Sequence, residues 1–302
     1  MVKATGVFCG VALVGLACFG ANPNSVEAAA PTNKVIASKN HDKAKWTLVE
    51  DLRFTNGLDR TLWTQFAYHP WQMKRPPSII TNDNLAYAAG GFLHLNAELN
   101  PKIDETYSYM GRGGRLWTRG KLNLHYGKVE IKARIDDQKG GAVAFWMMPE
   151  AKDVKWPLCG EIDIIEKLNC GHKVYQTPHS YRIDKEGKLE SPHWHGVPAV
   201  ETRDWNVYGF EWYPDELVWT VNGKVTHRYP KISDRKEDWP WTEPNYLRLE
   251  IMAENAVGTW VGPLEPSTLP FECRIESIKL YTGEMDGKSF GKVIWLDGRK
   301  GK

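Results

Sequence analysis

Hydrophobic and polar residues alternate with a period of two over many short segments of the chain. Alternation of this kind, in segments rich in β-branched and aromatic residues, predicts strands with one buried face. The segments that show it are 92–97, 116–124, 127–135, 141–148, 161–168, 206–213, 216–222, 246–253 and 273–282. No run of a dozen residues has helical periodicity. The pattern therefore predicts an all-β protein, built as a two-sheet antiparallel jelly-roll sandwich.

Turn residues separate these segments, and one turn has a clear geometric signature. Asn222-Gly223 stands between two alternating runs, 217–221 and 224–226. Asn-Gly suits the type I′ turn, whose two central residues both need a positive φ. A β-hairpin centred on Asn222-Gly223 is therefore expected.

The segment from Glu161 to Glu166 departs from strict alternation, because it reads Glu-Ile-Asp-Ile-Ile-Glu. Glu161 and Asp163 share one face of the strand. Uninterrupted alternation would turn Glu166 into the core, where an unpaired carboxylate is strongly unfavourable. A β-bulge at Ile164-Ile165 adds one residue and returns Glu166 to the acidic face. The segment thus predicts a bulged strand with a row of carboxylates on one side.

A row of carboxylates does not favour folding, because neighbouring like charges repel and raise one another's pKa values. An ordinary solvated strand face would also contain Lys, Thr or Arg. With the bulge absorbed, the backbones of Glu161 and Glu166 lie about four strand rises apart, roughly 13 Å. Two Glu side chains that lean toward each other bring their carboxyls within the ~5–5.5 Å that a retaining glycosidase needs. The row therefore indicates catalysis.

The six-residue segment resembles the bulged active-site signature of glycoside hydrolase family 16, as found in the laminarinase and agarase branch. Four further segments resemble family motifs in the family's order. They are the segments Tyr126 to Arg134, Ala144 to Pro149, Thr177 to His179 and Tyr208 to Trp212. The resemblance covers roughly residues 46–282.

The resemblance implies a concanavalin-like sandwich with a concave substrate cleft. It implies that Glu161 is the nucleophile, that Glu166 is the acid/base, and that Asp163 is a supporting carboxylate. The expected activity is that of a secreted, endo-acting, retaining β-glycosidase that hydrolyses internal β-linkages of a polysaccharide. A transglycosylase remains open, as does a catalytically silent, lectin-like carbohydrate-binding module, although such modules typically lose a catalytic Glu.

The substrate is open between two sugar classes. β-1,3-Glucan, as for a laminarinase, is slightly favoured. The alternative is an endo-β-galactosidase acting on agar, keratan or mucin-type chains. Loops around the cleft decide between glucose and galactose; those expected to do so are 66–83, 104–115, 183–200 and 233–245.

Fourteen tryptophans occur in the chain, and most are expected to fill the core. Those near a cleft stack on pyranose rings. The resemblance implies that Trp146 lies on the cleft floor, that Trp156 lies at the approach to the catalytic strand, and that His179 faces the cleft. Further substrate-binding candidates are Trp71, Trp117 and Trp241.

No cofactor is expected from the resemblance. A structural calcium ion is frequent in the family, and Glu50 and Glu276 fall near the places where its ligands are expected, although Asp is more usual than Glu276. A zinc site is not expected, because the spacing of Cys170, His172, His193 and His195 fits no common ligand pattern.

Residues 1–28 are expected to be a secretory signal peptide: Lys3 precedes an apolar run too short to span a bilayer, and a small-residue cleavage pattern ends at Ala28. Gly15 stands where a lipid-attachment signal at Cys18 needs a large aliphatic residue, so lipidation is disfavoured. Residues 29–45 are expected to be a linker, 46–284 the catalytic domain and 285–302 a tail. The expected location is secreted or periplasmic.

The net charge of +2, with no basic run, disfavours nucleic-acid binding. The expected partner is a glycan, with no membrane span, and the protein is expected to be a monomer. Cys159, Cys170 and Cys273 make an odd number of cysteines after the leader, so at least one thiol is unpaired within the chain. Cys159 and Cys170 bracket the acidic strand too far apart for a bridge, and a bridge from Cys273 to either stays open.

Overall fold

The computed structural model describes residues 41–66, 83–99, 111–150, 153–253 and 263–298. The predicted leader, Cys18 and Trp71 lie outside these residues. No helix within the described ranges is long and apolar enough to cross a membrane.

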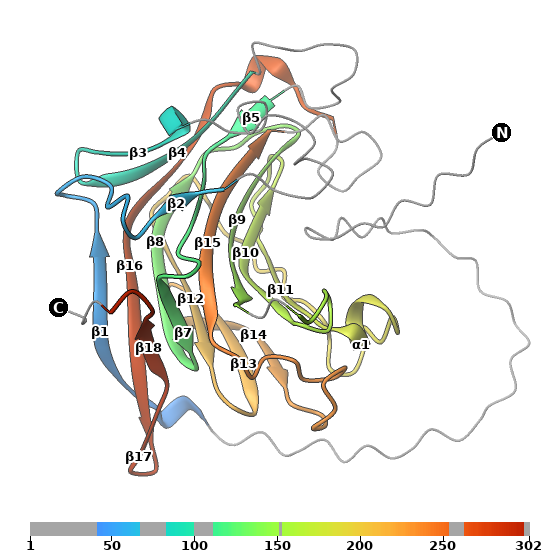
Figure 1. Cartoon of the computed structure of the whole chain (residues 1–302). Coiled ribbons are helices and arrows are strands. Elements are labelled where there is room, and N and C mark those ends of the chain that lie inside the picture. Colours follow the sequence, from blue (N-terminus) through green and yellow to red (C-terminus); the bar gives the residue numbers. More distant parts are fainter. Residues whose placement is uncertain (1–40, 67–82, 100–110, 151–152, 254–262, 299–302) are drawn as a thin grey trace, which may run out of the picture.

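Two antiparallel sheets pack face to face, as predicted (Figure 1). In sheet A the strand order is β14-β13-β12-β8-β16-β4-β3, with β1 and β17 paired to β16 and β5 paired to β4. Its strands are β1 Lys45–Arg53, β3 Ala86–Ala89, β4 Phe92–Leu99, β5 Gly111–Gly113, β8 Gly127–Ile135, β12 Asn206–Trp212, β13 Glu216–Val221, β14 Lys224–Pro230, β16 Phe271–Met285 and β17 Lys288–Phe290.

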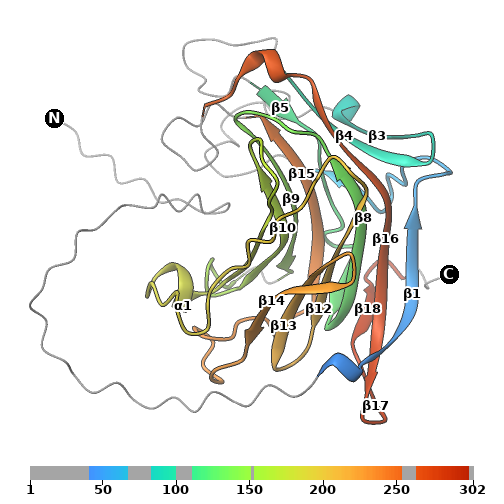
Figure 2. The ribbon, with the colours of Figure 1, turned by 180° about the vertical axis from the view of Figure 1, so that it is seen from behind.

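In sheet B the order is β11-β10-β9-β15-β6-β2, with β7 paired to β15 and β18. Its strands are β2 Thr64–Gln65, β6 Arg115–Trp117, β7 Leu122–His125, β9 Gly141–Pro149, β10 Glu161–Leu168, β11 Tyr175–His179, β15 Asn245–Ala253 and β18 Lys292–Trp295. The short helices are α1 Tyr181–Asp184 and the 3-10 turns His41–Lys43, Asp83–Leu85 and Pro266–Thr268. Both views show sheet B arched, with its free face concave (Figures 1 and 2); this face is called the concave face below.

Every predicted strand is present, and the differences have local causes. The predicted run 116–124 is two strands, because Thr118 closes a turn between them: its hydroxyl donates to the Leu122 carbonyl at 2.7 Å and accepts from Leu247 N at 3.1 Å. The predicted hairpin joins β13 to β14, and Asn222 and Gly223 have φ values of 52° and 77°, as a type I′ turn requires.

The segment expected to be a tail is largely ordered structure. β17 pairs with β16 in sheet A, and β18 pairs with β7 in sheet B. The indole nitrogen of Trp295 donates to Glu50 Oε1 at 2.8 Å. The C-terminal strands therefore connect the two sheets at one side of the sandwich.

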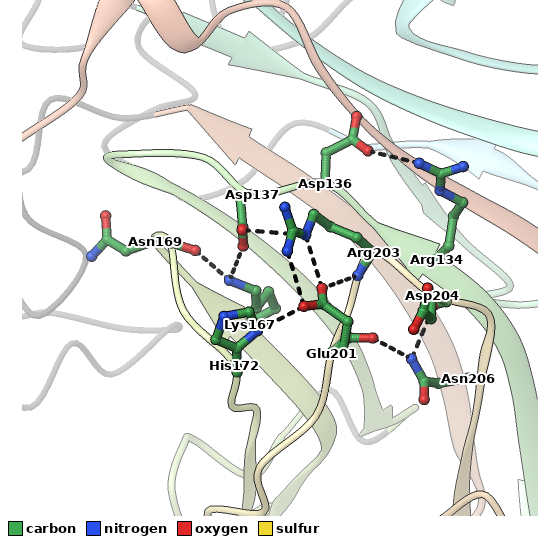
Figure 3. Close-up of polar contacts among 10 residues, drawn as sticks. All are labelled: Arg134, Asp136, Asp137, Lys167, Asn169, His172, Glu201, Arg203, Asp204 and Asn206. Carbon is green, nitrogen blue, oxygen red and sulfur yellow. Dashed lines mark hydrogen bonds and ion pairs between the residues drawn. The ribbon is translucent and has the colours of Figure 1, made fainter.

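One core of aliphatic and aromatic side chains lies between the sheets. β10 contributes Ile162, Ile164 and Ile165, all fully buried. The next residue to face this side is Lys167, which is also fully buried. Its ammonium group contacts Asp137 Oδ1 at 3.1 Å and the Asn169 carbonyl (Figure 3).

Lys167 is thereby part of a polar cluster at the end of β10. Asp137 Oδ2 lies 3.7 Å from Arg203 Nε, and Arg203 is held by both carboxylate oxygens of Glu201, at 2.9 and 3.0 Å. Figure 3 shows the chain of contacts from Lys167 through Asp137 and Arg203 to Glu201. A buried ammonium is tolerated only when it is paired, and this cluster supplies the partners of Lys167 at the end of β10.

Candidate active site

The predicted bulge lies in β10. Asp163 pairs with Trp146 and Ile165 pairs with Phe145 on the neighbouring β9, so Ile164 is the extra residue. Ile164 and Ile165 therefore both point into the core. Glu161, Asp163 and Glu166 are turned to the concave face, in the row that the sequence predicts.

Two indoles from distant segments hold the backbone of the acidic strand. Trp219, on β13 of sheet A, donates to the Asp163 carbonyl at 2.7 Å. Trp241 donates to the Glu161 carbonyl at 2.9 Å. Just before Glu161, Gly160 has a φ of 77°, and a Cβ there would lie 3.0 Å from both Pro240 and Trp241. Glycine is therefore required for this close approach.

The Trp241 contact corrects a prediction. Its ring is 1% exposed and belongs to the hydrophobic core, at 5.1 Å from the Trp239 ring. A ring with no free face cannot stack on a sugar. Trp241 instead positions the backbone of Glu161.

Each carboxyl of the row has a different environment. Trp156, in the loop before β10, donates its indole Nε1–H to Glu161 Oε2 at 2.7 Å. Asp163 Oδ2 lies 2.9 Å from His179 Nε2. The structure thus brings Trp156 and His179 to the row, with their ring centroids 5.9 Å apart.

A cationic stack lies beside the row on the concave face. The strand register aligns Asp163, Trp146, Arg248 and Trp117 across β10, β9, β15 and β6. The Arg248 guanidinium lies 3.8 Å from the centroid of the Trp146 ring and 4.4 Å from that of Phe66. Phe66 in turn stacks on Trp117 at 4.8 Å. Trp146 and Trp117, both predicted to bind substrate, are therefore parts of one aromatic cluster that surrounds Arg248.

The two outer carboxyls bind their protons tightly. Burial and the neighbouring Asp163 raise the pKa of Glu161 to about 8, while His179 and Arg248 oppose the rise. Burial and Asp163 also raise the pKa of Glu166 well above its usual value, with further contributions from Glu161 and Glu250. Loss of one proton from the pair makes loss of the second harder.

The environments indicate which carboxyl ionises first. Glu161 accepts a hydrogen bond from Trp156 and feels the positive charge of Arg248. Glu166 feels Glu250 instead, a fully buried carboxyl on β15. The negative charge is thus better stabilised on Glu161, and the proton on Glu166.

Several of these residues had no signal in the sequence. Trp219, Arg248 and Glu250 lie on strands whose alternation shows only which face each residue occupies. Asp184 is the least visible, although its carboxyl lies 2.8 Å from His179 Nδ1.

The metal candidates have protein partners. Glu276 forms ion pairs with Arg53 at 3.2 Å and with Lys132 at 2.6 Å, and Glu50 accepts the Trp295 hydrogen bond. His172 lies 2.8 Å from Glu201. Among the described residues, no group of three or more His, Cys, Asp or Glu side chains is arranged to hold a metal ion. Cys159, Cys170 and Cys273 are free thiols.

Comparison with known proteins agrees with the fold and with the acidic strand. Residues 79–265 match the model of the family described as glycosyl hydrolases family 16. The keratan-sulfate endo-1,4-beta-galactosidase of Sphingobacterium multivorum is 30% identical over 242 residues, which cover 77% of this chain and 54% of that protein. The beta-glucanase of Rhodothermus marinus is 30% identical over 211 residues, which cover 65% of this chain and 70% of that protein.

Solved structures give the same result. The X-ray structure of the laminarinase from Rhodothermus marinus superposes with a TM-score of 0.67 at 25% identity, covering 80% of this chain and all of that one. The catalytic domain of an endo-1,3-beta-glucanase from Thermotoga petrophila RKU-1 gives a TM-score of 0.67 at 27% identity, covering 78% and 98%.

The fold and the acidic row define a jelly-roll protein of the carbohydrate-active class. The chain belongs to glycosyl hydrolases family 16. It spans about half the length of the keratan-sulfate enzyme that it matches.

Proposed function

We propose that this chain is an endo-acting, retaining β-glycosidase that cleaves internal β-linkages of a polysaccharide. The observation that carries the proposal is the pair Glu161 and Glu166, two buried carboxyls on one face of a bulged strand, of which Glu161 ionises more readily because Trp156 donates to it and Arg248 lies near it, whereas Glu166 faces Glu250. A retaining mechanism requires that difference.

In this mechanism Glu161 attacks the anomeric carbon while Glu166 donates its proton to the departing glycosidic oxygen. A covalent glycosyl-enzyme forms and the leaving chain departs as an alcohol. Glu166, now ionised, removes a proton from water, which attacks the anomeric carbon and releases Glu161. Asp163 contacts His179 and so keeps the imidazole, with its charge, beside the row of carboxyls.

β-1,3-Glucan is the proposed substrate. The beta-glucanase of Rhodothermus marinus is matched over 70% of its length, and solved structures entitled laminarinase or endo-1,3-beta-glucanase superpose over nearly their whole length. A β-galactosyl chain is the second candidate, because the similarity to the keratan-sulfate endo-1,4-beta-galactosidase is equally high in identity and extends over more of this chain.

The remaining features of the proposal concern the protein as a whole. We propose that residues 1–28 direct export to a secreted or periplasmic location and that the protein acts as a monomer. The predicted linker 29–45 extends too far, because His41–Lys43 form a 3-10 turn, His41 is buried and β1 begins at Lys45. Trp156, His179, Trp117 and Trp71 are the proposed substrate contacts. Trp146 was also predicted to contact substrate, but it is as buried as Trp241, and its ring packs against the Arg248 guanidinium. A structural calcium ion remains a candidate ligand near Glu50 and Glu276.

A panel digestion tests the function. Protein comprising residues 29–302 is incubated with laminarin, lichenan, agarose, keratan and mucin glycans, beside the Glu161→Gln variant. Oligosaccharides from one substrate, absent with the variant, are expected, and their identity separates glucan from galactan. Turnover by Glu161→Gln at the wild-type rate would contradict the mechanism. Retained binding without cleavage by the wild type would favour the lectin-like module, and acceptor-dependent lengthening a transglycosylase.

A further inference from the structure

Asp184 is the last residue of α1, the short helix that follows β11. Its Oδ1 lies 2.8 Å from His179 Nδ1, while His179 Nε2 lies 2.9 Å from Asp163 Oδ2. The side chains of His179, Asp163 and Asp184 are 7%, 5% and 3% exposed. A buried imidazole is thus placed between two carboxyls, one of which belongs to the acidic row.

Two ionised carboxylates at the two ring nitrogens require a particular protonation state of His179. A neutral imidazole carries one N–H, whereas an imidazolium carries two. Only the imidazolium can donate to both carboxylates at once. Burial lowers the pKa of His179, but Asp184 and Asp163 outweigh burial and hold that pKa well above its usual value.

The local structure holds Asp184 firmly. Ser180 caps α1, since its hydroxyl accepts from Ile183 N at 3.3 Å and its carbonyl accepts from Asp184 N at 2.9 Å. Arg182 N donates to the Glu237 carbonyl, and the Arg182 guanidinium donates to the Ser191 carbonyl, both at 2.9 Å. The helix is therefore fixed to two neighbouring loops.

We propose that Asp184 is a positioning residue of the active site, which acts through His179 to keep a positive charge against Asp163. This inference rests on the proposed function. Burial raises the pKa of Asp163, and the hydrogen bond from His179 opposes that rise. Asp163 therefore depends on the imidazolium for its negative charge, and the imidazolium depends on Asp184.

The other charged groups around this unit fit the same assignment. His179 faces Glu161 and Glu166, and its positive charge favours ionisation of both. Arg182, two residues before Asp184, lies 3.8 Å from Asp238, so a carboxylate balances its charge. Tyr229 also faces this group. Burial raises the pKa of Tyr229 to about 12, although Arg182 opposes the rise, so the phenol stays neutral.

Loss of the Asp184 charge lowers the pKa of His179, so the imidazolium loses its proton at a lower pH. As pH rises through the lowered pKa of His179, the positive charge beside Asp163 is lost. The carboxyl row then becomes more repulsive, and Glu161 ionises less readily. The acidic limb of kcat/KM of the Asp184→Asn variant is therefore expected to move to higher pH.

Two measurements test this. NMR titration of the His179 ring in the substrate-free protein reports its protonation, and the pH profile of kcat/KM reports its effect. Wild-type His179 is expected to stay doubly protonated at pH 7, because its pKa lies well above the usual value. In Asp184→Asn the ring should lose its second proton at a lower pH than in the wild type, and the acidic limb of kcat/KM should move up by about one pH unit, which is about a tenfold loss on the acidic side. KM should change less than about twofold, because Asp184 does not contact substrate.

Glu186→Gln is the matched control. It removes a carboxylate two residues further on, whose partners are Lys188 at 2.7 Å and Arg235 at 3.3 Å, and it should leave both readouts unchanged. Asp184→Glu keeps a carboxyl and should keep His179 protonated.

A neutral wild-type His179 at pH 7 would overturn the inference, and this holds even if Asp184→Asn does not fold. An Asp184→Asn protein with unchanged titration and acidic limb would also overturn it. Failure of the proposed function looks different, since the wild type would then hydrolyse none of the polysaccharides.

Discussion

The indole nitrogen of Trp156 donates to Glu161 Oε2 at 2.7 Å, and this bond connects the loop before β10 to the first carboxylate of the row. A hydrogen bond to an ionised acceptor contributes about 1.5–3 kcal/mol. The bond is strongest when Glu161 carries its charge, so it favours the state that attacks substrate.

Trp156→Phe keeps the ring and removes this donor. We expect kcat to fall about 10- to 100-fold, because each 1.36 kcal/mol is about tenfold in rate, and we expect the acidic limb of kcat/KM to move to higher pH as Glu161 becomes harder to ionise. Steady-state kinetics from pH 4 to pH 9 measure both. The control is Trp205→Phe. Trp205 directly precedes β12 of sheet A and is 38% exposed. Identical profiles for the two variants would mean that the indole bond has no role.

Glu166→Gln is expected to stabilise the fold while abolishing turnover. Burial raises the pKa of Glu166, so the folded protein holds this proton more tightly than the unfolded chain. Stability linked to Glu166 is therefore highest below the pKa of the unfolded carboxyl and falls as pH rises toward the folded value. Glutamine has no such proton to lose.

The gain in stability should accordingly be larger at pH 8 than at pH 5. A gain of about 1 kcal/mol corresponds to a Tm increase of roughly 2–4 °C for a chain of this size. Calorimetric unfolding at the two pH values measures it. A gain that is equal at both, or larger at pH 5, would contradict the raised pKa.

The roles of the two glutamates predict opposite products with azide. In Glu161→Gly, azide can occupy the space of the lost nucleophile and attack from its side, so an activated β-glycoside should give the α-glycosyl azide. In Glu166→Ala, the covalent intermediate still forms on Glu161 and azide should give the β-azide. NMR of the anomeric proton distinguishes the products. The reverse assignment of anomers would exchange the roles of Glu161 and Glu166.

The contact between Lys167 and Asp137 predicts that removing either partner changes the free energy of unfolding by a different amount (Figure 3). Asp137→Ala leaves the fully buried Lys167 ammonium without its carboxylate and should lower the free energy of unfolding by about 1–3 kcal/mol, less than for a wholly buried pair because Asp137 is partly exposed. Lys167→Met removes the charge itself and should cost less. Urea unfolding of both variants gives the order, and a larger loss for Lys167→Met would show that the ammonium is a net stabiliser.

Much of the acidic strand could be predicted from local pattern. The side-chain period of a strand is two, so the sequence around Ile164 could place Glu166 on the concave face only through a bulge, and that bulge is present. The turn at Asn222-Gly223 was predictable for a similar reason, because its φ values depend on the two residues themselves. Trp241 could not be assigned in this way, since a tryptophan in a polar loop has the same local sequence whether it lines a cleft or enters the core.

The sequence by itself determined that the protein is a β-sandwich and that three carboxylates share one face of a bulged strand, because both follow from the alternation of side chains over a few residues. Tertiary structure alone decided which groups surround those carboxylates. Trp219 and Trp241 reach the backbone of β10 from positions 56 and 80 residues away, and Arg248 reaches the row through strand pairing. The pKa values of Glu161 and Glu166 depend on burial and on these neighbours, so the property that separates nucleophile from acid arises only when distant strands pack together.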